Sequence, residues 1–198
     1  MFSRSFPIFF AISLLIAMPF VSCAKKETRE ATLGNASITD FPQEAEMMET
    51  ALKNDPKNVD ILIQLGNLYY DWGQDEVDRE GNSAQPYDKW MRGISCYERA
   101  LEIDPGNVNV RTDMATLMRY AGQIDQAISE YRTALKLDPR HPQARINLIL
   151  ALGESKHDYK DALSEYDNLI KEVPDQKENL ELSQEVGAFR QAMKDGEK

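Results

Sequence analysis

Apolar residues recur every three or four positions along most of the chain after residue 40, and polar residues fill the positions between them. The clearest example is the stretch 108–141, where two such patterns follow one another. The apolar positions are Val110, Met114, Leu117 and Met118 in the first pattern, and Ile124, Ala127, Ile128, Tyr131, Ala134 and Leu135 in the second. This spacing is typical of helices that bury one face. The stretch therefore predicts two amphipathic helices in succession.

Two signals end these helices. Gly122 lies between the two patterns, and glycine can take the positive φ that closes a helix. Asp138-Pro139 ends the second helix, because proline has no N–H and restricts the residue before it. A hairpin of two such helices still has an uncovered apolar face, which a neighbouring hairpin must cover. The pattern therefore predicts a stack of helical hairpins.

The same pattern recurs on both sides of this stretch, and proline gives its period. Pro56, Pro105, Pro139 and Pro174 are 49, 34 and 35 residues apart. Small and aromatic residues recur in register with them: Leu65-Gly66-x-x-Tyr69, Gly93-x₃-Tyr97, Ala127-x₃-Tyr131-x₂-Ala134 and Ala162-x₃-Tyr166-x₂-Leu169. A period of 34 with these positions resembles the tetratricopeptide repeat. The tryptophan of that repeat is replaced by Leu62, Arg111 and Arg145.

The resemblance implies an all-α fold, a solenoid of three helix-turn-helix repeats in a domain over residues 41–195. The repeats are expected at 58–105, 107–139 and 141–174. We expect a flanking helix at 41–54, with Pro42 at its first position, and a capping helix at 178–194. The aromatic residues expected in the core are Trp72, Trp90, Tyr97, Tyr131 and Tyr166.

Two repeats depart from the period in length. The first is longer by about 15 residues, and the surplus lies at 75–89. We interpret 75–89 as a solvated loop, because its acids lack the order of a calcium-binding loop. We expect the first helix of this repeat to continue beyond Gly73 towards Arg79, and the second to begin with Pro86 at its first position. Repeat three has one extra residue near His157.

The start of the chain has a different character. Arg4 precedes an uncharged run over 5–24, which contains Cys23. This resembles a bacterial lipoprotein signal peptide, which implies a signal over 1–22, lipidation of Cys23 and a flexible tether over 23–40. An uncleaved membrane anchor is an alternative, because the run has 20 residues. Simple secretion is another.

All three alternatives export the remainder of the chain. The lipoprotein alternative implies attachment to the bacterial envelope, facing the periplasm. Ala24 follows the cysteine where an inner-membrane retention signal would carry Asp, which favours the outer membrane.

Charge excludes one class of partner. The chain has a net charge of −10, and removal of residues 1–22 would take away one Arg and no acid, which gives −11. Nucleic acid repels so acidic a chain, so we expect no nucleic-acid partner. If Cys23 is lipidated, Cys96 is a lone thiol, and we expect it to be half-buried and inert.

Catalytic and metal-binding chemistry finds little support. The two histidines, His141 and His157, have no ligand-type partner three or four residues away. No phosphate-binding, dinucleotide-binding or hydrolase motif occurs. We therefore expect no enzyme activity, no metal site and no cofactor.

Binding is the expected role, because the resemblance implies that the first helices of successive repeats line a concave groove. The residues that the family pattern places there are Asp60, Ile63, Asn67, Tyr70, Asp71, Asn109, Thr112, Thr116, Arg119, Tyr120, Gln143, Ile146 and Leu150. Such a mixed surface suits an extended segment or a helix of a protein partner. The Lys/Asn clamp of chaperone-type repeats is absent, since Ile63 stands where Lys is needed.

Arg111 and Arg145 occupy the same position in neighbouring repeats. One hypothesis pairs them with surface Asp or Glu. The other makes them, together with Arg119, a basic strip for an acidic partner.

The sequence thus favours a membrane-tethered adaptor that binds a protein or peptide in cell-envelope protein assembly. Tetratricopeptide proteins of cytochrome c biogenesis and lipoprotein pilotins of pili and secretins are similar in architecture, and supply alternatives. Rivals of other classes are a ligand or metal carrier, an enzyme, and a self-assembling structural protein. The oligomeric state stays open.

Overall fold

The computed structural model describes residues 40–80 and 86–196, and this part of the chain is helical without strands. Its α-helices are α2 (Phe41–Asn54), α3 (Val59–Glu80), α4 (Tyr87–Ile103), α5 (Val108–Tyr120), α6 (Ile124–Leu137), α7 (Pro142–Leu150), α8 (Tyr159–Glu172) and α9 (Leu180–Gly196). A π-helical turn (Ala151–Ser155) follows α7, and a 3₁₀ helix (Pro174–Glu178) precedes α9. The all-α solenoid is confirmed. The expected signal peptide, Cys23 and nearly all of the tether lie outside the described residues.

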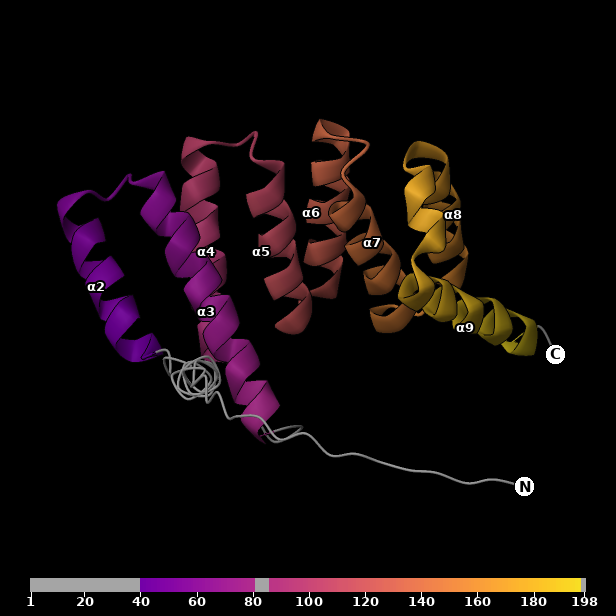
Figure 1. Cartoon of the computed structure of the whole chain (residues 1–198), viewed down its shortest axis with the longest axis horizontal. Helices are drawn as coiled ribbons and strands as arrows, with labels where there is room; N and C mark the ends of the chain where they lie inside the picture. The colour runs from indigo at the N-terminus through magenta and orange to yellow at the C-terminus, as the bar shows by residue number, and fades with distance from the viewer. Residues whose placement is uncertain (1–39, 81–85, 197–198) are drawn as a thin grey trace, which may run out of the picture. The chain divides into compact units, whose positions relative to one another are not determined.

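The helices form hairpins that stack in the order of the sequence: α3 with α4, α5 with α6, and α7 with α8 (Figure 1). Helix α2 packs on α3 at one end, and α9 packs on α8 at the other. One continuous apolar core runs through the stack, with Leu62, Leu117, Tyr131 and Leu148 among its fully buried members. Among the described helices, none is both long and apolar enough to cross a membrane.

Four helices that follow a proline junction begin with the same cap. The side chains of Asn58, Asn107, His141 and Asn179 each accept a hydrogen bond from the backbone N–H three residues later, at 3.1 Å. The caps stand at the starts of α3, α5, α7 and α9 and satisfy N–H groups that the helices themselves leave unpaired. Asp40 and Asp158 cap α2 and α8 in the same way, at 3.1 and 3.2 Å.

The predicted core aromatics divide into two groups. Tyr97 and Tyr131 are buried. Trp72, Trp90 and Tyr166 are half-buried and pack against the core from its edge.

The insert in the first repeat is largely helical, which corrects the expectation of a loop at 75–89. Helix α3 continues to Glu80, in agreement with the expected continuation beyond Gly73 towards Arg79. Helix α4 already includes residues 87–89. Arg79 pairs with Asp75 at 2.6 Å within α3, and Lys89 pairs with Glu76 at 2.9 Å across to α4. Pro86 is the residue before the helix rather than its first residue. Residues 81–85 are outside the described part.

The extra residue of repeat three is absorbed in one turn. After α7 the helix widens into the π-helical turn, in which the Lys156 N–H bonds to the carbonyl of Ala151 at 3.1 Å, five residues earlier. His157 then takes a φ of 59°, which is uncommon for a residue other than glycine. Gly122 takes the equivalent role in the second repeat with φ 79°, as predicted. The chain therefore enters α8 in register.

Helix α9 is the capping helix, beginning at Leu180 rather than at 178. Its residues Leu182, Val186 and Phe189 are buried. A Cβ at Gly153 would lie 2.3 Å from the Phe189 ring, so only glycine allows the ring to pack this closely.

Candidate functional site

Two adjoining cavities lie along the first helices of the repeats. One, of about 410 Å³, is lined by Asn67, Tyr70 and Asp71 of α3, Tyr97 of α4, Asp113, Thr116, Arg119 and Tyr120 of α5, and Gln143 and Asn147 of α7. The second, of about 310 Å³, shares Gln143 and Asn147 and is completed by Ile146, Leu150, Glu154, Asn179, Glu181, Leu182 and Glu185. We call the two together the groove. It runs from α3 to α9 and is large enough for several side chains.

Nine of the thirteen residues that the sequence proposes for the groove line it. In the first cavity these are Asn67, Tyr70, Asp71, Thr116, Arg119, Tyr120 and Gln143, and in the second Ile146 and Leu150.

Four proposed groove residues line neither cavity. Thr112 is buried, and its hydroxyl donates to the carbonyl of Val108 at 2.8 Å, so it belongs to the core. Asn109 lies 2.8 Å from the His141 ring through its amide oxygen, at the capped ends of the helices. Asp60 is exposed at the start of α3, and Ile63 packs against the apolar core.

Sequence reasoning missed several groove residues. Asp113 and Asn147 are 34 residues apart and so share one position of the repeat, directly after Thr112 and Ile146. A polar residue at that position in two successive repeats is the signal that could have revealed them. Tyr97 comes from a second helix, and the acids Glu181 and Glu185 come from α9, which the repeat pattern does not cover.

A hydrogen-bonded network fixes the middle of the groove. The hydroxyl of Thr116 donates to the carbonyl of Thr112 at 2.9 Å, so Tyr131 must donate to Thr116 across their 3.0 Å contact. Asn147 Nδ2 also donates to Thr116, at 3.0 Å, and Gln143 donates to Asn147 Oδ1 at 2.8 Å. The two amides are thereby oriented, and Gln143 is exposed with polar atoms facing solvent.

At the α3 end, tyrosines surround an exposed amide. The Tyr97 hydroxyl donates to Asn67 Oδ1 at 2.6 Å, which holds the Asn67 side chain at the rim. The rings of Tyr70 and Tyr120 meet at 6.1 Å between centroids. Burial, with Tyr120 as the next cause, raises the pKa of Tyr70 to about 12, so the phenol stays protonated. This wall is aromatic and uncharged.

Asp71 and Asp113 add two carboxylates to the same cavity. Neither makes a hydrogen bond or an ion pair with any residue that the structure describes. Burial raises the pKa of each carboxyl, and His141 partly opposes the shift at Asp113. Burial therefore makes ionisation of these two carboxyls less favourable than that of an exposed aspartate.

The arginines do not form a basic strip, so that hypothesis is wrong. Arg111 pairs with Glu130 at 2.5 Å and Arg145 with Glu165 at 2.6 Å, each between the two helices of its own repeat. Arg119 lies over the Tyr120 ring at 5.2 Å and bonds to Glu154 at 3.2 Å. Each of the three guanidinium groups thus has an acidic partner within the solenoid, as the other hypothesis expects for Arg111 and Arg145.

His141 and Cys96, the remaining candidates for reactive side chains, contribute to the helix caps and the core. His141 caps α7, and Cys96 is buried rather than half-buried as expected. Burial raises the pKa of its thiol to about 11. Within residues 40–80 and 86–196, no group of three His, Cys, Asp or Glu side chains is arranged to hold a metal ion.

Comparison with known families agrees with this geometry. Residues 112–177 match the family model of the tetratricopeptide repeat. The chain contains tetratricopeptide repeats. The match covers part of the second repeat and the third, and the structure extends the same hairpin to α3 and α4.

Curated relatives share these repeats over part of their length. The inactive TPR repeat-containing thioredoxin TTL3 of Arabidopsis thaliana is 29% identical over 86 residues, which are 42% of this chain and 12% of the relative. The heat-shock protein cognate co-chaperone sgt12 of Aspergillus fumigatus is 30% identical over 96 residues, 48% of this chain and 28% of the relative. The chain thus spans less than a third of either tetratricopeptide relative.

Solved structures share the fold. The first TPR domain of human RPAP3 is 21% identical with a TM-score of 0.57, covering 72% of this chain and 97% of the domain. The first TPR of Spaghetti (RPAP3) bound to the HSP90 peptide SRMEEVD is 20% identical with a TM-score of 0.50, covering 66% and 97%.

Proposed function

We propose that this protein is an adaptor whose groove binds an extended segment of a partner protein. The observation that carries the proposal is the row of amides along α3 and α7: Asn67, Gln143 and Asn147 line one continuous hollow, and neighbouring side chains fix Asn67 and Asn147. An extended chain offers backbone N–H and C=O groups that amide side chains can satisfy. The tyrosines and Ile146 supply apolar contact beside them.

The comparisons support a binding role. One similar structure holds an HSP90 peptide on a tetratricopeptide domain, and one relative is named as a co-chaperone. We propose that the present groove acts without catalysis, since its carboxylates, amides and tyrosines hold no activated nucleophile. The described groove also contains no lysine, so it differs from a clamp for an acidic C-terminus.

We further propose that Cys23 carries a lipid and tethers the solenoid to the bacterial envelope, facing the periplasm, where it serves envelope protein assembly. Incorporation of labelled palmitate into the chain, lost in Cys23→Ser, tests this part. A chain that incorporates no label and retains residues 1–22 would contradict lipidation and favour the anchor.

The groove itself is tested by capture of partners from an envelope extract with the full chain. The variant Asn67→Ala with Tyr70→Ala should lose capture by about tenfold or more, because both side chains face the groove. Its melting temperature should stay near that of the parent, because Asn67 is exposed and Tyr70 only half-buried.

The matched control removes the same residue types outside the groove. Gln126→Ala with Tyr87→Ala changes an exposed amide and an exposed tyrosine on α6 and α4. Capture by the control should equal that of the parent. Equal capture by all three proteins would place the partner elsewhere on the surface.

A further inference from the structure

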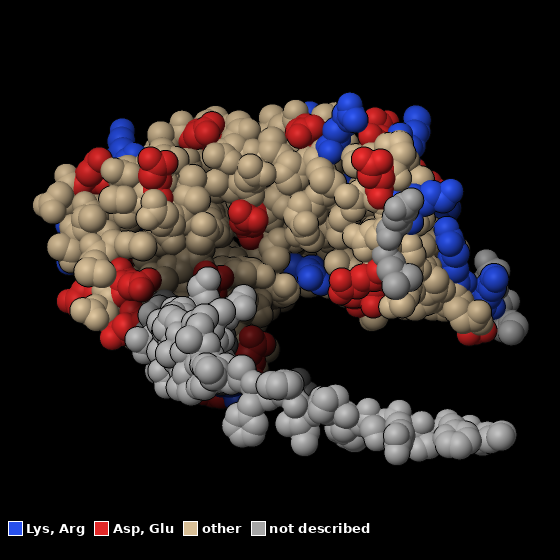
Figure 2. Space-filling model, viewed as in Figure 1, with Lys and Arg blue, Asp and Glu red and all other residues tan. Residues whose placement is uncertain are grey.

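The groove is acidic. Its lining contains the carboxylates of Asp71, Asp113, Glu154, Glu181 and Glu185 against the single guanidinium of Arg119, and no lysine. Fully ionised, these described groups carry a net charge of −4. On the face drawn in Figure 2, by contrast, Lys and Arg gather over α8 and α9, at the far end of the stack from α2. The whole chain is acidic, and its acidic residues also outnumber its basic ones in the groove itself.

Only one of the five carboxylates is neutralised within the solenoid. Arg119 bonds to Glu154 and covers the Tyr120 ring. Asp71, Asp113, Glu181 and Glu185 make no side-chain hydrogen bond or ion pair with the residues that the structure describes. Elsewhere in the repeats, Glu130 and Glu165 are paired with Arg111 and Arg145. The groove thus offers four carboxylates to a ligand.

The surroundings of Asp71 and Asp113 suit a cation in particular. Tyr70, Tyr97 and Tyr120 line the same cavity, and an aromatic face attracts an ammonium or guanidinium group. The guanidinium of Arg119 already lies over the Tyr120 ring, with its Cζ 5.2 Å from the ring centroid. A cation between the two carboxylates would also offset the burial that now raises the pKa of both.

We infer that the partner segment is basic, with a Lys or Arg side chain seated between Asp71 and Asp113 against Tyr70, and further cations towards Glu181 and Glu185. This inference rests on the groove binding proposed above and names the chemistry of its occupant. The peptide SRMEEVD, which a domain of the same fold holds, has two Glu and one Asp against one Arg. The groove of the present chain selects against such a sequence, since four unpaired carboxylates would face its acids.

The test measures binding of three labelled decapeptides to the full chain in a non-ionic detergent. The peptides alternate alanine with lysine, glutamine or glutamate and are otherwise identical, and fluorescence anisotropy gives each Kd. The lysine peptide should bind more tightly than the glutamine peptide, and the glutamate peptide should bind least. A glutamate or glutamine peptide that binds as tightly as the lysine peptide overturns the inference.

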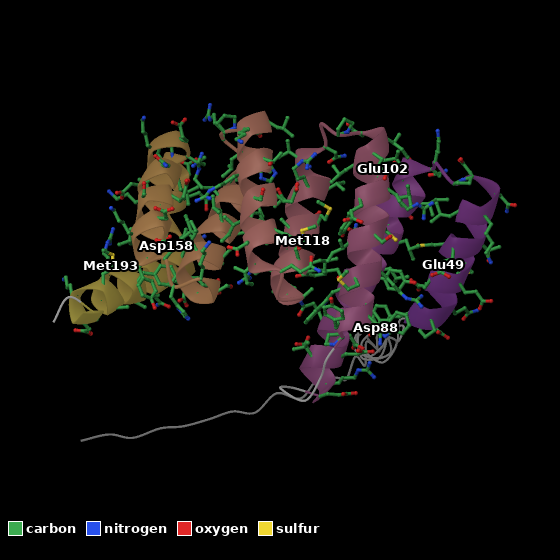
Figure 3. The ribbon with its side chains drawn as sticks, turned by 180° about the vertical axis from the view of Figure 1, so that it is seen from behind. Glu49, Asp88, Glu102, Met118, Asp158 and Met193 are labelled. Carbon is green, nitrogen blue, oxygen red and sulfur yellow. The ribbon has the colours of Figure 1, made fainter. Side chains whose placement is uncertain are left out.

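Two variants separate the groove from general attraction to an acidic protein. Asp71→Asn with Asp113→Asn should weaken lysine-peptide binding about tenfold, the size expected of a partly desolvated charge contact. Glu98→Gln with Glu102→Gln removes the same charge from exposed positions on α4, where Figure 3 labels Glu102. This control should change the Kd less than about twofold. Equal losses in both variants overturn the inference, as does a complete lack of peptide binding.

These outcomes are distinct from failure of the proposed function. If the neutral peptide binds, and Asn67→Ala with Tyr70→Ala abolishes that binding while the aspartate pair has no effect, the groove is a binding site and the inferred basic occupant is wrong. If Asn67→Ala with Tyr70→Ala leaves both partner capture and lysine-peptide binding intact, the proposed function and the inference fail together.

Discussion

Arg145 of α7 reaches the carboxylate of Glu165 in α8, with 2.6 Å between Nη1 and Oε2. Its second amino group donates to the carbonyl of Pro139 at 2.8 Å. Arg111 repeats both contacts one hairpin earlier, to Glu130 and to Pro105. In the first repeat, where Leu62 replaces the arginine, Arg99 of α4 donates to the carbonyl of Pro56 instead. The arginines thus join the helices of a repeat to the proline junction before it.

Arg145→Leu should lower the free energy of unfolding by about 2–3 kcal/mol, because Arg145 and Glu165 are largely buried and Glu165 would lose its partner. Arg145→Leu with Glu165→Leu should recover at least half of that loss, because no unpaired charge remains. Arg132→Leu is the control: its pair with Asp161 is half exposed, so we expect a change within about 0.5 kcal/mol. Urea unfolding measures all three, and equal losses in Arg145→Leu and Arg132→Leu would contradict the prediction.

Gly153→Ala should lower the free energy of unfolding by about 1–3 kcal/mol, because the new methyl group would overlap the Phe189 ring. Phe189→Leu in the same chain should relieve part of the overlap. Gly187→Ala provides the contrast, since nothing lies within 4 Å of its Cβ and the residue is exposed in α9. For Gly187→Ala we expect the free energy of unfolding to rise by up to about 1 kcal/mol, because alanine has the higher helix propensity. Thermal unfolding followed by circular dichroism would detect the opposite signs.

The two groove aspartates should make stability depend on pH. Burial raises the pKa of Asp71 and of Asp113 in the folded state, so each favours folding when protonated and loses that contribution as pH rises through the raised pKa. Asp71→Asn with Asp113→Asn removes this loss. The variant should therefore be more stable than the parent at pH 7, and the difference should shrink near pH 3. A difference that is constant across urea titrations at both pH values would rule the explanation out.

Cys96 should resist alkylation in the folded protein. Burial raises the pKa of its thiol to about 11, so only about one molecule in ten thousand carries the thiolate at pH 7. Iodoacetamide should label Cys96 slowly in the native chain and rapidly in urea, as read by mass spectrometry of the peptide that contains it. Rapid native labelling would show that the thiol is accessible and reactive.

The repeating features of the fold could be predicted from the sequence because each one is local. Gly122 and the Asp-Pro pairs end helices by backbone geometry alone, and the apolar period decides which faces are buried. The continuation of α3 towards Arg79 was expected, but the apolar period does not determine where it ends, because Asp75 to Glu80 has no apolar face. This segment is accompanied instead by the ion pairs Arg79–Asp75 and Lys89–Glu76.

The groove was predictable only in part. The family pattern identifies which helices line it, and Asn67, Tyr70 and Gln143 follow from that. Whether Thr112 or the adjacent Asp113 faces the cavity depends on the rotation of α5, which packing determines. Thr112 can be buried because its hydroxyl is satisfied within its own helix.

The π-helical turn at Ala151–Ser155 has a consequence for how such an array tolerates change. One surplus residue is confined to a single helix end, where Lys156 and Asp158 bond to the carbonyls of Ala151 and Leu152 at 3.1 and 2.8 Å. Downstream, α8 and α9 stay in phase with the hairpins before them. An array of this kind can therefore gain residues between stacked hairpins while the groove-lining residues of successive repeats keep their alignment.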